Sequence, residues 1–260
     1  MKDLISSSPC GNVVVVGLGS QPLAYVVSTS TLLTLPPATA PITAVACTAD
    51  KVAVVSGKVV STYDIDIKGK ECALSRTWEV PKKASSLVFV PETEGTPGAL
   101  AVGDKAGDVT SYELGAAGGD KVRSRHVVGH TASMVTCLSF DADSEALLSG
   151  DRDEKIRVTT LSAPHRLKGL LMGHTAYVSA LCAAGGKAMT AAGDGTVRLW
   201  NVKTAREIQK WDVESTASSV ALGKVDAAYA IDASDEFYVC SEAEGGGKWG
   251  EARKVKVRAG

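Results

Sequence analysis

Aromatic side chains make up only 5% of this 260-residue chain, and no run approaches the roughly 18 consecutive apolar residues of a membrane-spanning helix. The first residues also lack the apolar core of a signal peptide. Six cysteines are present, but none forms a C-x-x-C pair, and most lie in apolar, strand-like runs as small buried hydrophobic residues do. We therefore expect a soluble intracellular protein in a reducing compartment, without a metal site.

Catalytic motifs are missing as well. The chain has no G-x-S-x-G, no Walker loop and no G-x-G-x-x-G that follows a strand. Two of the four histidines, His126 and His165, have no second histidine or carboxylate at metal-ligand spacing. With 28 basic and 29 acidic residues the net charge is −1, which excludes a polyanion-binding role for the chain as a whole. We expect a protein that is not an enzyme and carries no cofactor.

The sequence does contain a repeat. The dipeptide Gly-His occurs at Gly129-His130 and at Gly173-His174, and an apolar alternating run and an Asp-containing turn follow each copy. Aligning Asp153 with Asp194 gives a period of 41 residues. A period of about 40–45 residues that begins at Gly-His and ends near Trp-Asp is typical of a four-stranded propeller blade.

Each repeat supplies side chains for one buried polar network. In such a network an imidazole lies between a carboxylate and a hydroxyl, and an indole N–H finds an acceptor, which fixes one register when every member is satisfied. We assign a structural role, not a catalytic one, to His174, Thr190, Asp194 and Trp200. The upstream copy offers His130, Ser149 and Asp153, with Thr159 in place of the indole.

Strand-like runs separated by turn residues continue along the whole chain, and no helical period of useful length is present. The sequence therefore predicts an all-β fold, a single β-propeller of WD repeats over residues 1–260 with about six blades. The first unit shows three runs, Val13–Val16, Leu23–Val27 and Thr31–Leu35. The expected blades cover residues 10–37, 42–80, 85–128, 133–172, 177–213 and 218–259.

One hairpin is much more charged than a plain Asp-Gly turn requires. Residues 151–155 are five successive charged residues, and Arg157 adds a sixth on the strand that follows. One interpretation is a solvated turn with internal ion pairs, each contributing only ~0–1 kcal/mol. The other is a binding surface, since Ala163-Pro164-His165 and Arg166 add a second polar cluster to the same unit.

The segment from Gly150 to Val158, GDRDEKIRV, continues through Ala163-Pro164-His165 to Gly173-His174-Thr175. Together with the run VGDKAGDV at Val102–Val109, it resembles the WD-repeat, non-catalytic subunit of the tRNA (guanine-7-)-methyltransferase. Close similarity covers about residues 99–201. That family has seven blades and a longer C-terminal part, so the six units seen here are a departure from it.

The resemblance implies a non-catalytic scaffold that binds and stabilises an AdoMet-dependent catalytic subunit as a heterodimer. That complex forms 7-methylguanosine in the variable loop of tRNA (guanosine 46), and the family location implies the nucleus. By the same resemblance, Arg157 would face an acidic residue of the catalytic subunit, Glu154 would hold the guanidinium, and Lys155 and Arg152 would add positive charge. Lys105 is the next candidate for this interface. Contact with tRNA would be mostly indirect, through the complex.

Two other readings stay open. A generic WD-repeat scaffold, such as a substrate receptor of a ubiquitin ligase or a ribosome-biogenesis platform, would share the fold, because propellers host many functions. Such a scaffold has no need of the ordered charges from Arg152 to Arg157. A propeller enzyme would need convergent acid, base or metal groups at the central channel, and the sequence offers none.

Overall fold

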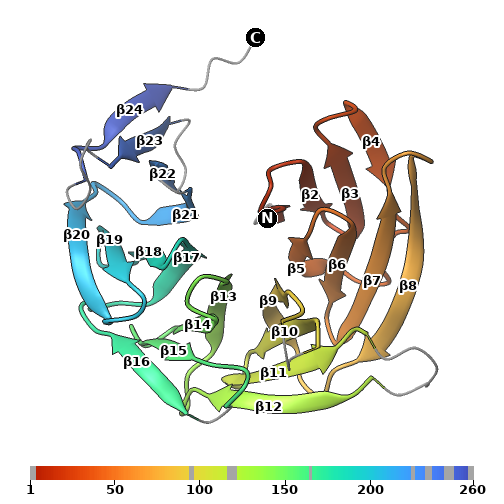
Figure 1. The fold of residues 1–260 in the computed structure, drawn as a ribbon, viewed down its shortest axis with the longest axis horizontal. Coiled ribbons are helices and arrows are strands. Elements are labelled where there is room, and N and C mark those ends of the chain that lie inside the picture. Colours follow the sequence, from red (N-terminus) through yellow and green to blue (C-terminus); the bar gives the residue numbers. More distant parts are fainter. Residues whose placement is uncertain are drawn as a thin grey trace. The chain divides into compact units, whose positions relative to one another are not determined.

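The computed structural model describes residues 4–93, 97–115, 122–163, 166–223, 226–231, 236–242 and 249–256. Every regular element in these ranges is a β-strand, and the 24 strands form six antiparallel sheets of four strands each (Figure 1). The all-β fold predicted from the repeat is therefore confirmed. No helix in the described part of the chain is long and apolar enough to cross a membrane.

The first three sheets follow one another along the chain, each a four-stranded meander. The first holds β1 (Leu4–Ser7), β2 (Val13–Leu18), β3 (Gln21–Val26) and β4 (Thr31–Thr34). The second holds β5 (Ile42–Cys47), β6 (Lys51–Ser56), β7 (Val59–Asp66) and β8 (Glu71–Glu79). The third holds β9 (Ala84–Val90), β10 (Ala99–Asp104), β11 (Asp108–Glu113) and β12 (Ser124–Gly129).

The last three sheets repeat this plan. The fourth holds β13 (Val135–Asp141), β14 (Ala146–Asp151), β15 (Ile156–Thr159) and β16 (Leu167–Leu171). The fifth holds β17 (Val178–Ala184), β18 (Lys187–Ala192), β19 (Thr196–Asn201) and β20 (Arg206–Asp212). The sixth holds β21 (Ala217–Leu222), β22 (Asp226–Ile231), β23 (Glu236–Ser241) and β24 (Arg253–Lys256).

The first sheet has one strand more than the sequence predicted. β1 pairs with β2 in the register Leu4↔Gly17 to Ser7↔Val14. Its sequence, LISS, is only four residues long and half serine, so its local pattern alone does not reveal a strand. The pairing partner β2, with its four consecutive valines, is what recruits it.

The chain divides into two compact units. The first contains residues 1–106 and 110–125, and the second contains residues 107–109 and 126–260, so the boundary falls within the third sheet. In the first unit, alternating residues of β2 and β3 such as Val13, Val15 and Ala24 are fully buried and pack with Val52 and Tyr63 of the second sheet. A period of two along each strand thus builds the core between successive sheets.

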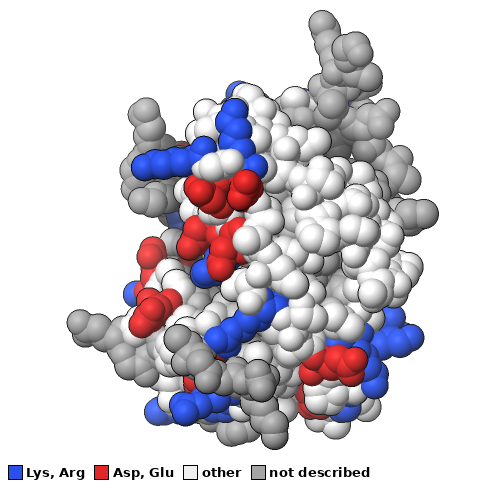
Figure 2. Space-filling model, turned by 90° about the vertical axis from the view of Figure 1, so that its right-hand side faces the viewer, with Lys and Arg blue, Asp and Glu red and all other residues white. Residues whose placement is uncertain are grey.

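The first sheet is also free of charge. Residues 4–49 contain no Asp, Glu, Lys, Arg or His. On the face turned away from the core, Tyr25 and Leu32 lie opposite each other and are exposed. Seen from the side of β4 and β8, the surface carries a broad uncharged area, with charged side chains gathered beside it (Figure 2).

In the second unit, β14 is buried along its whole length, and Leu148 of this strand packs with Val178 and Trp200 of the fifth sheet. The sheets approach so closely that Gly150 has no room for a side chain. A Cβ atom there would lie 2.7 Å from Sγ of Cys137 and 3.0 Å from Val178. This close approach sets the charged hairpin that follows Gly150 directly beside the start of β17.

Candidate protein-binding site

The polar network of the fifth sheet joins the four side chains named from the sequence. Nδ1 of His174 lies 3.0 Å from the Asp194 carboxylate and Nε2 lies 2.8 Å from the Thr190 hydroxyl, to which the Trp200 indole N–H donates at 2.8 Å. A neutral imidazole with its proton on Nδ1 satisfies this pattern. Burial lowers the pKa of His174 and outweighs the opposing effect of the Asp194 carboxylate. The network therefore has a structural role, with His174 in its neutral form.

The fourth sheet corrects one assignment. His130 bonds through Nε2 to Ser149 at 2.7 Å, as expected, but its Nδ1 bonds to Asp151 at 2.8 Å and not to Asp153. Asp151 also accepts the backbone N–H groups of Asp153 at 2.8 Å and Lys155 at 2.9 Å. Alignment by the 41-residue period placed Asp153 opposite Asp194 and was wrong about the network. In the fourth sheet the carboxylate belongs to the last residue of β14, whereas in the fifth sheet it belongs to the turn that follows β18.

Thr159 occupies the ladder position of the missing indole. It pairs with Leu147 as Trp200 pairs with Ala188 in the fifth sheet. Its side chain is buried, and its hydroxyl has no hydrogen-bond partner among the described residues. The fourth sheet therefore lacks the connection between the hydroxyl and the indole that completes the network of the fifth.

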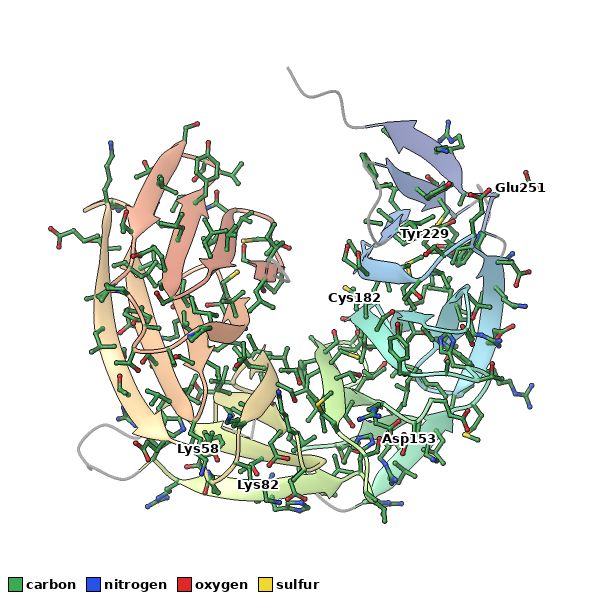
Figure 3. The ribbon with its side chains drawn as sticks, turned by 180° about the vertical axis from the view of Figure 1, so that it is seen from behind. Lys58, Lys82, Asp153, Cys182, Tyr229 and Glu251 are labelled. Atoms are coloured by element: carbon green, nitrogen blue, oxygen red, sulfur yellow. The ribbon has the colours of Figure 1, made fainter. Side chains whose placement is uncertain are left out.

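The charged hairpin is exposed and is held by its backbone. Arg152, Asp153, Glu154 and Lys155 are all exposed, at the position that Asp153 marks in Figure 3. Glu154 has φ 71°, nearly the φ of 72° at Gly195 in the matching turn of the fifth sheet. Within the described ranges, none of these four side chains forms an ion pair or side-chain hydrogen bond. The interpretation as a turn closed by internal ion pairs therefore has no support in the structure.

Arg157 and Arg198 occupy the same position in successive sheets, but their surroundings differ. Arg157 lies opposite Ser149 as Arg198 lies opposite Thr190. Arg198 donates from Nη1 to Glu207 at 2.6 Å and from Nε to Thr196 at 3.2 Å. These two contacts leave the guanidinium of Arg198 anchored within its own sheet.

Arg157 has neither of these contacts. In the fourth sheet, Leu167 pairs with Thr159 at the position where Glu207 pairs with Trp200 in the fifth sheet. Lys155 stands where the fifth sheet has Thr196. Nε of Arg157 is buried and has no hydrogen-bond partner in the described part of the chain. Glu154, expected to hold this guanidinium, forms no ion pair with it among the described side chains. Among the described residues, Arg157 is thus a partly buried cation without an ion-pair partner.

Arg157 lies within electrostatic range of the polar network of the fourth sheet. Burial lowers the pKa of His130, and the charges of Arg157 and Lys155 lower it further, against the raising effect of Asp151. A carboxylate brought to this place from outside would supply the acceptor that the Nε–H of Arg157 lacks.

Other sequence candidates lie elsewhere. Lys105 is an exposed residue of the β10–β11 turn in the first unit, where its backbone N–H donates to Lys83 at 3.0 Å. Pro164 and His165 fall outside the described residues, while the adjacent Arg166 is exposed. Met172 and Tyr177, two exposed hydrophobic residues around the second Gly-His, were not predicted from the sequence. Their signal was that large apolar side chains stand in a loop, outside the alternation of any strand.

Residues 115–242 match the family model described as tRNA methyltransferase TRM82 WD40 domain. The chain is related to this family. It is 33% identical over 141 residues to the tRNA (guanine-N(7)-)-methyltransferase non-catalytic subunit WDR4 of Homo sapiens, covering 53% of this chain and 32% of the relative. The corresponding protein of Danio rerio is 30% identical over 185 residues, covering 66% of this chain and 41% of the relative. The matches thus span well under half the length of these relatives.

A solved structure shows the fold independently of sequence. A chain in the Crystal Structure of Mitotic Checkpoint Complex superposes with a TM-score of 0.79 at 17% identity, covering 98% of this chain and 79% of the other. At this identity the likeness concerns the fold alone. The function rests on the sequence relatives and on the site.

Proposed function

We propose that this chain is a non-catalytic subunit that binds and stabilises the AdoMet-dependent catalytic subunit of a tRNA (guanine-N7-)-methyltransferase. The complex would form 7-methylguanosine at guanosine 46 in the variable loop, as a heterodimer located in the nucleus. The names of the relatives support a subunit that is not itself catalytic. The chain has a net charge of −1, so the catalytic subunit would supply most of the contact with tRNA.

The observation that carries this proposal is the buried Nε–H of Arg157, which has no acceptor among the described residues. A buried donor left without an acceptor costs about 1–3 kcal/mol, and a chain that only needed a stable sheet would favour the arrangement around Arg198. The fourth sheet has Leu167 at the ladder position where the fifth sheet has Glu207. The Arg157 side chain therefore remains available to an acidic residue of a partner. Lys155 and Arg152 on the exposed hairpin would steer that partner by charge.

The test is co-purification and affinity measurement with the catalytic subunit from the same organism. Arg157→Leu should weaken binding by about 2–4 kcal/mol, or roughly 30- to 1000-fold in Kd, because a desolvated Arg–carboxylate contact is typical of a hot spot. Arg206→Leu, at an exposed arginine on β20, is the matched control and should leave Kd unchanged. Guanosine methylation of unmodified tRNA by the mixture should follow Kd. A wild-type chain that binds no such subunit would favour the generic scaffold.

A further inference from the structure

Two large hydrophobic side chains are exposed at the ends of one short loop. Met172 follows β16 directly and is 63% exposed, and Tyr177 precedes β17 directly and is 47% exposed. Between them, His174 and the backbone N–H of Thr175 both bond to Asp194, a member of the polar network described above. A loop that is fixed in its middle and apolar at both ends presents a defined surface.

The ring of Tyr177 rests on a glycine. A Cβ atom on Gly193 would lie 2.3 Å from the Tyr177 ring, so only glycine allows this ring position. The N–H of Gly193 donates to the carbonyl of Tyr177 at 2.9 Å, and the next residue, Val178, is fully buried. The backbone of Tyr177 is therefore fixed and its ring lies against Gly193, which limits the conformational entropy lost on binding.

The start of the loop is fixed as well. Asp194 accepts the backbone N–H of Thr175 at 3.0 Å and lies 3.0 Å from Nδ1 of His174. Gly173 lies against Arg198 and Trp200, where a Cβ atom would come within 2.5 Å and 3.0 Å of their side chains. The two glycines around this loop thus serve close packing, and they set the directions in which Met172 and Tyr177 leave the backbone.

The loop continues the charged hairpin. β15 and β16 pair up to Ile156↔Leu171, so Met172 stands one residue beyond the last pair, where Lys155 stands on the other strand. At the other end of the loop, Val178 packs against Gly150, which precedes the hairpin in β14. The loop that carries Met172 and Tyr177 therefore adjoins the charged hairpin within the second unit.

We propose that Tyr177 and Met172 are apolar anchors that bind the same catalytic subunit as Arg157, an inference that rests on the proposed function. The partner surface would pair an acidic residue for Arg157 with an apolar recess for the Tyr177 ring. Tyrosine, methionine and arginine are the residues enriched in the centres of protein interfaces. A nucleic acid fits less well, because residues 151–157 contain three acidic and three basic side chains and offer phosphate no net positive charge.

The experiment measures Kd for the purified catalytic subunit. Tyr177→Ala should weaken binding about 10- to 30-fold and Met172→Ala by about 5-fold, as expected for anchors in a desolvated contact. Tyr177→Phe keeps the ring and should stay within about 3-fold of the wild type. Tyr25→Ala is the matched control, an exposed tyrosine of the first sheet that is 40% exposed, and it should leave Kd unchanged.

Gly193→Ala tests the positioning of the ring without removing it. The new methyl group would displace the Tyr177 ring, and binding should weaken in the same direction as in Tyr177→Ala. If Tyr177→Ala lowers the melting temperature, a photo-crosslinking phenylalanine at position 177 of the otherwise wild-type chain replaces it, and it should form a covalent adduct with the catalytic subunit.

The outcomes separate the two proposals. If Arg157→Leu weakens binding but Tyr177→Ala, Met172→Ala and the crosslink show no effect, the apolar anchors are wrong and the proposed function stands. If the wild-type chain does not bind the catalytic subunit, both fail. If Tyr25→Ala weakens binding as much as Tyr177→Ala, the interface lies elsewhere and the anchor assignment is overturned.

Discussion

Asp151 and Asp153 are two acidic residues of the hairpin whose substitution by alanine should affect stability very differently. The Asp151 side chain is 2% exposed and accepts three hydrogen bonds, from Nδ1 of His130 and from the backbone N–H groups of Asp153 and Lys155, all at 2.8–2.9 Å. A net contribution of about 1 kcal/mol for each bond gives about 3 kcal/mol. Asp151→Ala should therefore lower the free energy of unfolding by about 3 kcal/mol.

Asp153→Ala is the matched control. Its side chain is exposed, and the backbone N–H that bonds to Asp151 is kept in alanine, so the free energy of unfolding should change by less than about 0.5 kcal/mol. Urea denaturation of the two variants and the wild type, followed by circular dichroism, measures both values. A larger loss in Asp153→Ala than in Asp151→Ala would refute the assignment of Asp151 to the network and restore the one made by sequence alignment.

Three further predictions concern the same unit. Burial lowers the pKa values of His130 and His174 in the folded chain. Their contribution to stability is therefore complete above about pH 6.5, the value of an unfolded histidine, and falls as the pH drops below it. Urea denaturation at pH 7.5 and pH 5.5 should show this loss of stability, and the loss should be smaller in the His174→Asn variant. Arg198→Leu removes the contacts to Glu207 and Thr196 and should lower the free energy of unfolding by about 1–2 kcal/mol, whereas Arg157→Leu should not lower it, and thermal melts of the two variants compare them directly. Glu154→Gly relieves a φ of 71° and should raise stability by up to about 1 kcal/mol; a lower melting temperature than the wild type would contradict that expectation.

Local patterns determined much of the architecture. The recurrence of Gly-His and the period-two alternation predicted four-stranded units, since a strand that buries one face must alternate whatever its surroundings. The network of His174, Thr190, Asp194 and Trp200 could also be named in advance, because each polar group needs a partner and the spacing offers one. The charged hairpin and Arg157 stood out by composition alone.

Tertiary structure decided what the side chains at these positions do. In the fourth sheet the carboxylate that bonds to the histidine is Asp151, at the end of β14, and not Asp153. In the fifth sheet it comes from the turn after β18. An alignment at constant spacing does not reveal this difference. The isolation of Arg157 depends on Leu167, which pairs with Thr159 at the ladder position that Glu207 holds in the fifth sheet. Tyr177 becomes an anchor only because Gly193, sixteen positions later, leaves space for its ring. These are contacts between residues on different strands, and only the folded chain brings such residues together.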